Sequence, residues 1–364
     1  MKRLSLLITM ALVTGATTSS FAAGRTHIEI VGSSTVYPFS TVVAEIFGKK
    51  TTFKTPKVES TGSGGGFKLF CAGGGIDTPD ITNSSRRIKK SEVEQCAANG
   101  VNAITEVHIG FDGITIANAK KAPDFKLTRR DIFLALVKEV PSKKDGELIA
   151  NPYKTWQDVN SALPATKIEV LGPPPTSGTR DAFAELALEG GCKTFDWIKQ
   201  LKTDSKAAKQ AGDKAKATTL KNKYKTICHT VREDGAYIEA GENDNLIVQK
   251  LDKNPAALGI FGFSFLEQNS DKVKGAAIDG VAISFESIAD GTYPISRPLY
   301  FYVKNDHVGK VPGIKEFIAE FTHDDAWGDD GYLTEKGLIP LEPAKRKAMA
   351  TSAQGLALLK LDAE

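Results

Sequence analysis

One unit occurs three times along the chain: a short apolar strand, a turn of small polar residues, and a helix. The first copy runs from HIEIVGS into YPFSTVVAEIFGKK, which places Phe39, Val43 and Phe47 on one helical face. The other copies are KVESTGSGGGFKLFCAGG and KIEVLGPPPTSGTRDAFAELALEG. Repeated strand-to-helix junctions are typical of parallel sheets, so the sequence predicts an α/β fold with mostly parallel sheets flanked by helices.

The length of the chain predicts two lobes. A chain of 364 residues is longer than one hydrophobic core usually organises. Two β-rich runs, at 107–118 and 295–305, read as hinge strands that pass between lobes. If both cross, the two ends of the chain share a lobe. We therefore predict lobe 1 at 24–112 with 292–364, and lobe 2 at 113–291.

The first residues read as a cleaved secretory signal. Lys2 and Arg3 precede an apolar stretch that begins at Leu4, and small polar residues lead to Ala23. The apolar stretch is too short for the ~20 residues that span a bilayer. We expect residues 1–23 to be removed, leaving an exported protein.

The mature chain is expected to be close to neutral. Removal of Lys2 and Arg3 from the 47 basic residues leaves 45, against 44 acidic residues. A nucleic-acid binder usually carries a clear basic excess. No nucleic-acid partner is therefore expected.

The four cysteines form two well-separated pairs along the chain. They are Cys71, Cys96, Cys192 and Cys228, without the C-x-x-C spacing of a zinc or redox motif. In an exported protein such cysteines favour disulfides, each contributing roughly 3 kcal/mol. Pairing Cys71 with Cys96 and Cys192 with Cys228 is the most local solution. The connectivity stays open, as does the alternative of four buried thiols.

A lysine-rich segment lies at about 199–225, between Cys192 and Cys228. It holds few large apolar residues. Two interpretations are open: a solvated helical insertion, which we favour, and a patch that meets an anionic surface.

Four turns concentrate the residues that bind small anions. A helix N-terminus leaves backbone N–H groups unpaired, and serine and threonine add hydroxyl donors. A single such turn is ordinary helix capping, but four of them, two with arginine, predict convergence on one small oxyanion. The candidate binding residues are Ser34, Thr35, Ser63, Ser85, Arg86, Ser177, Gly178, Thr179 and Arg180.

At these turns the chain resembles a known family, the periplasmic phosphate-binding proteins of phosphate-specific ABC transporters. The likeness covers nearly the whole mature chain, in family order. It is carried by GSSTVYPF, STGSGGGFKLF, DITNSSRRIK, LTRRDIFLAL followed by NPYKTW, PPPTSGTRDAF, GENDNLIVQKL with ALGIFGFSFLEQ, and YPISRPLYFYV.

The resemblance implies a periplasmic, hinged, two-lobe binding protein of the type II periplasmic-binding-protein-like fold. Such a protein closes over inorganic phosphate in a cleft and presents it to an ABC transporter permease in the inner membrane. It implies a monomer without a cofactor. Carried over residue by residue, Ser34 and Thr35 match the first turn, Ser63 the second, and Ser85 the third. Residues 177–180 match the fourth.

One departure concerns the choice of anion. Some family members have an aspartate in the third turn that accepts the proton of bound phosphate and so rejects sulfate. This chain has Ser84, Ser85 and Arg86 there. Asp181 is a candidate for the proton-accepting role, which is otherwise unassigned. Sulfate and molybdate therefore stay alternatives to phosphate.

Two other classes of function remain open. An exported phosphatase would need a metal cluster or an activated nucleophile, and neither G-x-x-x-x-G-K-[ST] nor G-x-S-x-G is present. We expect no enzyme and no metal. A surface-adhesion protein on the same fold is the third interpretation. The histidines show no ligand spacing; they are His27, His108, His229, His307 and His323.

Overall fold

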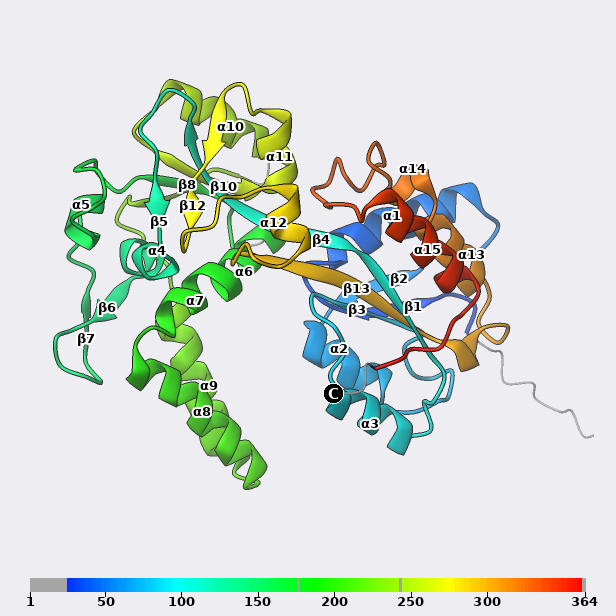
Figure 1. The fold of residues 1–364 in the computed structure, drawn as a ribbon. Coiled ribbons are helices and arrows are strands. Elements are labelled where there is room, and N and C mark those ends of the chain that lie inside the picture. The colour runs from blue at the N-terminus through cyan, green and yellow to red at the C-terminus, as the bar shows by residue number, and fades with distance from the viewer. Residues whose placement is uncertain (1–24, 176, 242–243, 362–364) are drawn as a thin grey trace, which may run out of the picture.

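The computed structural model describes residues 25–175, 177–241 and 244–361 (Figure 1). The predicted signal at 1–23 lies outside the described residues, as does Thr176. The strands are β1 Glu29–Gly32, β2 Lys57–Ser60, β3 Ile81–Ser84, β4 Ile104–Ala119, β5 Lys126–Leu127, β6 Glu139–Pro141, β7 Leu148–Ala150, β8 Val170–Gly172, β9 Tyr237–Glu239, β10 Leu258–Gly262, β11 Val273–Gly275, β12 Ala277–Ile278 and β13 Ser296–Lys304.

Helices follow most of these strands. The α-helices are α1 Tyr37–Lys50, α2 Ser63–Phe70, α3 Lys90–Ala98, α4 Arg129–Leu136, α5 Trp156–Val159, α6 Gly178–Phe183, α7 Glu189–Cys192, α8 Asp196–Gln210, α9 Lys214–His229, α10 Asp244–Lys253, α11 Phe263–Gln268, α12 Phe285–Ala289, α13 Ile314–Phe321, α14 Asp324–Trp327 and α15 Pro343–Gln354. A π-helical turn at Ala184–Leu188 joins α6 to α7, and a 3₁₀ turn covers Asn305–His307.

The strands form a mixed sheet in the order β2-β1-β3-β13-β4-β10-β8-β9, with β11 also paired to β4. The pairs among β1, β2 and β3 are parallel, as are those among β8, β9 and β10. The pairings of β4 and β13 are antiparallel. The α/β prediction is confirmed, and the parallel pairings lie where the strand-turn-helix unit repeats.

The first repeat shows why the unit folds as predicted. Phe39, Val43 and Phe47 recur at a spacing of four residues in α1, and all three are buried. A proline stands in the first turn of α1, and Lys49 and Lys50 stand in the last. Phe47 meets Phe317 of α13 edge to face, with ring centroids 5.7 Å apart. This packing fixes α1 over the sheet and so fixes the turn that precedes it.

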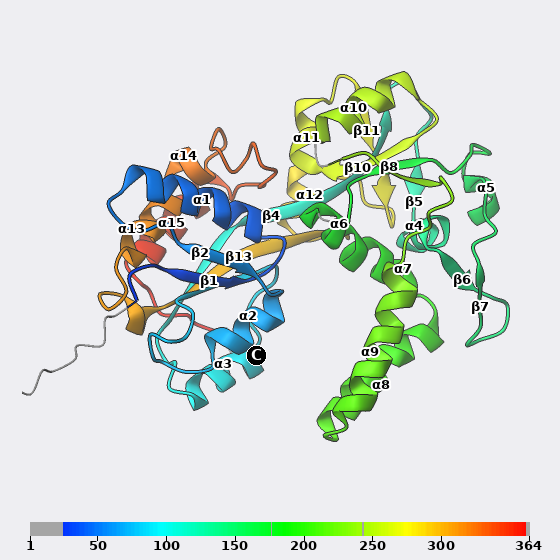
Figure 2. The same ribbon diagram turned by 180° about the vertical axis from the view of Figure 1, so that it is seen from behind.

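Two strands run between the halves of the molecule, as Figures 1 and 2 both show. The first part of β4 pairs with β13 over residues 104–113, and its last part pairs with β10 over 114–117. The predicted hinge runs are thus both strands. The register between them shifts at Leu299 and Tyr300, opposite Gly110. Gly110 has φ +140°, and a Cβ there would lie 2.3 Å from the Ile339 carbonyl oxygen, so only glycine fits this bulge.

Separate hydrophobic clusters lie on either side of these strands. One cluster is drawn from residues 114–295 together with Ile339. Two others are drawn from residues 28–109 and 299–353. The chain therefore folds into two lobes, each with its own core. The exact lobe bounds given above stay predictions.

Both disulfides join cysteines that are neighbours in the order of the sequence, as the most local pairing predicted. Cys71 bonds to Cys96, and Cys192 bonds to Cys228. The second bond closes the base of the lysine-rich insertion, which forms the paired helices α8 and α9 and extends away from lobe 2 (Figure 1). These two helices cover most of the segment at 199–225. Within the described ranges no helix has the length and apolarity to cross a bilayer.

Candidate functional site

The first predicted turn follows β1. The chain can turn there because Gly32 has φ +130° and packs against the neighbouring strand, where a Cβ would lie 2.2 Å from the Asn83 carbonyl oxygen. The Ser33 hydroxyl accepts hydrogen bonds from the backbone N–H groups of Thr35 and Val36, at 3.2 and 3.4 Å. Ser33 therefore holds the turn, and the candidate donors are the two residues after it.

The second and third turns meet each other. Ser63 begins α2, and Ser85 follows β3. Their hydroxyl oxygens lie 3.3 Å apart, and the Ser85 backbone N–H donates to the Ser63 hydroxyl at 3.1 Å. Because β2, β1 and β3 run parallel in that order, the turns after all three strands lie along one edge of the sheet.

The fourth turn comes from lobe 2 and reaches the first turn. The Ser177 hydroxyl caps α6 by accepting from the Thr179 backbone N–H at 3.2 Å. A Cβ built on Gly178 would lie 3.5 Å from the Ser34 carbonyl oxygen and 3.8 Å from the Thr35 Cα. The structure thus brings Gly178 beside Ser34 and Thr35, although 143 residues separate Gly178 from Thr35 in the sequence.

The two predicted arginines are held differently. The Arg86 guanidinium makes two hydrogen bonds to the Glu92 carboxylate, at 2.7 and 2.9 Å. Arg180 lies over the Tyr237 ring, 4.4 Å from its centroid, and donates to the Pro173 carbonyl oxygen at 3.4 Å. Arg180 forms no ion pair with any described residue, so its charge is the less compensated of the two.

The ring beneath Arg180 stays a neutral phenol. Burial raises the pKa of Tyr237 to about 12, against the opposing effect of the Arg180 charge. The Tyr237 hydroxyl donates to the Pro173 carbonyl oxygen at 2.7 Å. The proline run before the turn is therefore tied down by the same tyrosine on which Arg180 lies.

Sequence reasoning missed Arg297, a buried arginine in β13. One of its terminal nitrogens donates to the Thr35 hydroxyl, and the other donates to the Glu185 carboxylate at 2.8 Å. Its Nε faces Asp112 in β4 at 3.4 Å. Arg297 therefore joins the first turn, the region after α6 and a hinge strand.

The signal for this group was present in the two β-rich runs. A charged residue inside an apolar strand needs an opposite charge when it is buried, and the two runs hold charges of opposite sign. Arg297 stands in ISRPLYFYVKN and Asp112 in VHIGFDGITIAN. Burial raises the pKa of Asp112, while the Arg297 charge lowers it. Asp181, the candidate proton acceptor, is exposed in the first turn of α6.

The arrangement suits an anion. The Thr35 hydroxyl accepts from Arg297, so its own proton is free to be donated outward. Serine hydroxyls, backbone N–H groups and Arg180 add further donors around the same turns. Among the described residues no group of three histidine, cysteine, aspartate or glutamate side chains is placed to hold a metal ion.

Comparison with known proteins finds relatives that cover most of the chain. Residues 17–325 match the family described as the PBP superfamily domain. Protein SphX of Synechococcus elongatus is 31% identical over 91% of this chain and 82% of its own length. Phosphate-binding protein PstS of Staphylococcus haemolyticus is 31% identical over 83% of this chain and 79% of its own length.

A solved structure agrees with the fold. The crystal structure of a possible phosphate binding protein from Planctomyces limnophilus is 25% identical in sequence, with a TM-score of 0.67. The match covers 91% of this chain and 98% of that protein.

Proposed function

The chain belongs to the PBP superfamily, and from this premise we propose that it binds inorganic phosphate between its lobes and delivers it to the permease of an ABC transporter. A relative and a solved structure that are named for phosphate binding span most of the chain and support this assignment. The role is binding and transfer, not catalysis.

The observation that carries the proposal is the meeting of Gly178 with Ser34 and Thr35. These residues come from different lobes, and each turn ends in backbone N–H groups and hydroxyls. Burying an isolated oxyanion costs tens of kcal/mol in a low-dielectric estimate, so a site for phosphate must surround it with donors. Donors from two lobes can do so only when the lobes come together.

Each candidate residue has a stated role. The hydroxyls of Ser34 and Thr35, with those of Ser63 and Ser85, donate to phosphate oxygens from lobe 1. From lobe 2, the Gly178 backbone N–H and the hydroxyls of Ser177 and Thr179 donate, and Arg180 supplies a positive charge. Arg86 is kept as a candidate, but phosphate has to compete there with Glu92.

Ligand binding favours the closed arrangement of the lobes. Only contacts that differ between the open and closed forms shift the equilibrium between them, and contacts from both lobes exist only in the closed form. Arg297 lies in the hinge strand β13 and touches Thr35 and Glu185. Arg297 thereby joins the first turn to the π-helical turn Ala184–Leu188 of lobe 2 through hydrogen bonds.

The finer aspects of the proposal follow from the family role. We expect a chain exported to the periplasm by removal of 1–23, acting there as a monomer. Mass determination of the N-terminus of the exported protein tests the cleavage, and sedimentation tests the oligomeric state. A retained N-terminus or a stable dimer would contradict these points.

Calorimetric titration with four anions tests the choice of ligand. Phosphate and arsenate share shape and protonation, whereas sulfate is fully ionised near neutral pH. If Asp181 accepts the proton of phosphate, arsenate binds and sulfate and molybdate do not. Equal heats for phosphate and sulfate would reject selectivity. Release of phosphate from a chromogenic ester would instead support an enzyme.

A further inference from the structure

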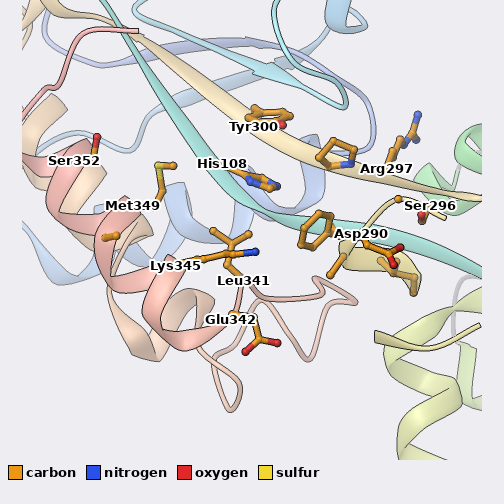
Figure 3. A pocket seen from close by; sticks show the side chains of 16 residues that line it. His108, Asp290, Ser296, Arg297, Tyr300, Leu341, Glu342, Lys345, Met349 and Ser352 are labelled. Carbon is orange, nitrogen blue, oxygen red and sulfur yellow. The ribbon is translucent and has the colours of Figure 1, made fainter. Parts of the chain in front are cut away.

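A cavity of about 720 Å³ lies against the hinge strands, apart from the polar turns (Figure 3). Its lining comes from β4 and β13, from the end of α12, and from one face of α15. This volume is within the range of sites for small organic molecules. The function proposed above makes no use of it.

The strand side of the cavity is aromatic. The His108 ring stacks on Tyr300, with centroids 4.7 Å apart and planes 25° apart. Phe111 meets the His108 ring edge to face at 4.9 Å. Leu341 and Met349 from the α15 side add apolar surface. Flat aromatic faces favour a flat, mostly apolar molecule.

Among the polar groups at the cavity, Lys345 favours an anionic substituent, whereas the Asp290 carboxylate is already bonded to Thr292. Figure 3 shows the Lys345 side chain extending into the cavity, whereas the Glu342 carboxylate points away. Lys345 forms no ion pair with any residue in the described part of the chain. His108 adds an acceptor for a donor group elsewhere on the ligand: its Nε2 lies 3.1 Å from the Gly110 carbonyl oxygen and so carries the proton, which leaves Nδ1 unprotonated in the neutral ring. Burial lowers the pKa of His108 to about 4, so the ring is neutral at physiological pH.

We propose that this hinge cavity is a second ligand site, which takes a flat, mostly apolar organic anion whose charged group pairs with Lys345. We further propose that its occupation changes the phosphate affinity. The first part stands on the cavity alone, and the second rests on the function proposed above.

Coupling between this cavity and phosphate binding is expected because the walls of the cavity belong to both lobes. Ile288 of α12 belongs to the lobe 2 cluster, whereas Met349 of α15 packs on the lobe 1 cluster. A rotation of one lobe against the other therefore changes the cavity. Arg297 lines it as well and donates to Thr35 in the candidate anion site. A ligand that fits one lobe arrangement better shifts phosphate affinity, and phosphate shifts that ligand's affinity by the same factor.

Binding of 1-anilinonaphthalene-8-sulfonate, a flat apolar sulfonate, tests the site by fluorescence and calorimetry on the whole mature chain. We expect one saturable site. Ala348→Trp places an indole in the cavity and should abolish it, while Lys345→Gln should weaken it about tenfold. The controls Ala344→Trp and Lys347→Gln change exposed residues of the same helix that do not line the cavity, and should bind as the parent does. Absence of saturable binding, or binding unaffected by Ala348→Trp, would overturn the site.

Phosphate titrations with and without the saturating sulfonate test the coupling. We expect the phosphate Kd to change at least threefold in the parent and not in Ala348→Trp, whose own phosphate binding shows that it folds. An unchanged phosphate Kd would overturn the coupling but not the second ligand site. If the parent binds the sulfonate and never binds phosphate, the cavity stands and the proposed phosphate function fails.

Discussion

Arg180 and Arg130 are both arginines that lie on aromatic rings, but only Arg180 lies beside the candidate anion site. Arg130 lies 4.0 Å from the centroid of the Phe195 ring and donates to Thr194. Arg180 lies on Tyr237 and directly follows Thr179. Comparing alanine variants of the two arginines therefore separates the effect of charge near the anion from the effect of losing a stacked arginine.

Replacing Arg180 with alanine should weaken phosphate binding by about 2 to 3 kcal/mol, because one charge-assisted hydrogen bond is lost. Arg130→Ala should leave the phosphate Kd unchanged. Calorimetric titration measures both. Thermal unfolding of the phosphate-free proteins should differ little from that of the parent. An Arg180→Ala protein with the parent's affinity would remove Arg180 from the site.

The lowered pKa of His108 predicts that the protein loses stability on acidification. Its pKa is lowered by burial from 6.5 to about 4 in the folded chain. Between these values the unfolded chain binds a proton that the folded chain does not, so the free energy of unfolding falls as the pH drops from 6.5 to 4. The contribution is at most about 3 kcal/mol.

Urea unfolding at pH 7 and pH 4.5 measures this effect. His108→Gln keeps a side-chain amide that can donate to the Gly110 carbonyl oxygen but does not titrate. Its free energy of unfolding should fall less between the two pH values than that of the parent. His323→Gln, at an exposed histidine, is the control. Equal losses in His108→Gln and the parent would show that His108 is not responsible.

At the scale of elements, Glu189 joins the paired helices α8 and α9 to lobe 2. Its carboxylate accepts from Lys202 at 2.8 Å and from the Tyr224 hydroxyl at 3.0 Å, and it lies 2.9 Å from His229 Nε2. Burial alone would raise the pKa of Glu189, but hydrogen bonds from His229 and Lys202 outweigh it and hold the pKa well below its usual range. This carboxylate therefore stabilises the fold above its unfolded pKa, and the stabilisation is lost in acid.

Replacing Glu189 with glutamine should lower the free energy of unfolding at neutral pH by about 1 to 2 kcal/mol, because the part-exposed Lys202 and His229 lose a charged acceptor that they share. Glu233→Gln, at an exposed glutamate of the same lobe, should change it by no more than about 0.5 kcal/mol. Urea unfolding with circular dichroism detects the difference. Equal stability of the two variants would mean that Glu189 does not anchor the helices.

Patterns within single elements were readable from the sequence, and contacts between distant elements were not. The spacing of Phe39, Val43 and Phe47 predicted α1, and the β-rich runs predicted β4 and β13. The turns were identified because helix capping uses recognisable residues. Arg297 was missed because its partners lie on three other segments, and nothing local in the sequence indicates which buried charges meet.

The same limit applies to Arg86. Its place in a polar turn predicted an anion ligand, and this role stays a prediction. The structure places the guanidinium on Glu92, six residues later, at the third residue of α3. A carboxylate at that position of a helix commonly caps the helix, so its second role, binding arginine, could not be read from the sequence.

At the scale of the whole molecule, Gly178 lies where the two lobes meet. The space beside it admits a methyl group at ordinary contact distance from Ser34 and Thr35. A larger side chain would have to push the first turn away. The size of the residue at 178 therefore controls how closely the lobes approach.

Gly178→Val should weaken phosphate binding about tenfold or more, because it opposes closure, with little change in thermal stability without phosphate. Gly178→Ala should lie between Gly178→Val and the parent. Calorimetric titration gives the Kd values, and small-angle scattering gives the change in radius of gyration on adding phosphate. A valine variant that binds and contracts as the parent does would place the anion away from Gly178.

The proposed function requires this chain to hold one phosphate between its lobes. Equilibrium dialysis of the phosphate-free mature chain against radiolabelled phosphate tests it most directly, with an excess of unlabelled sulfate as competitor. One phosphate should be retained per chain at micromolar concentration, undisplaced by sulfate. No retained phosphate with a folded chain would contradict it.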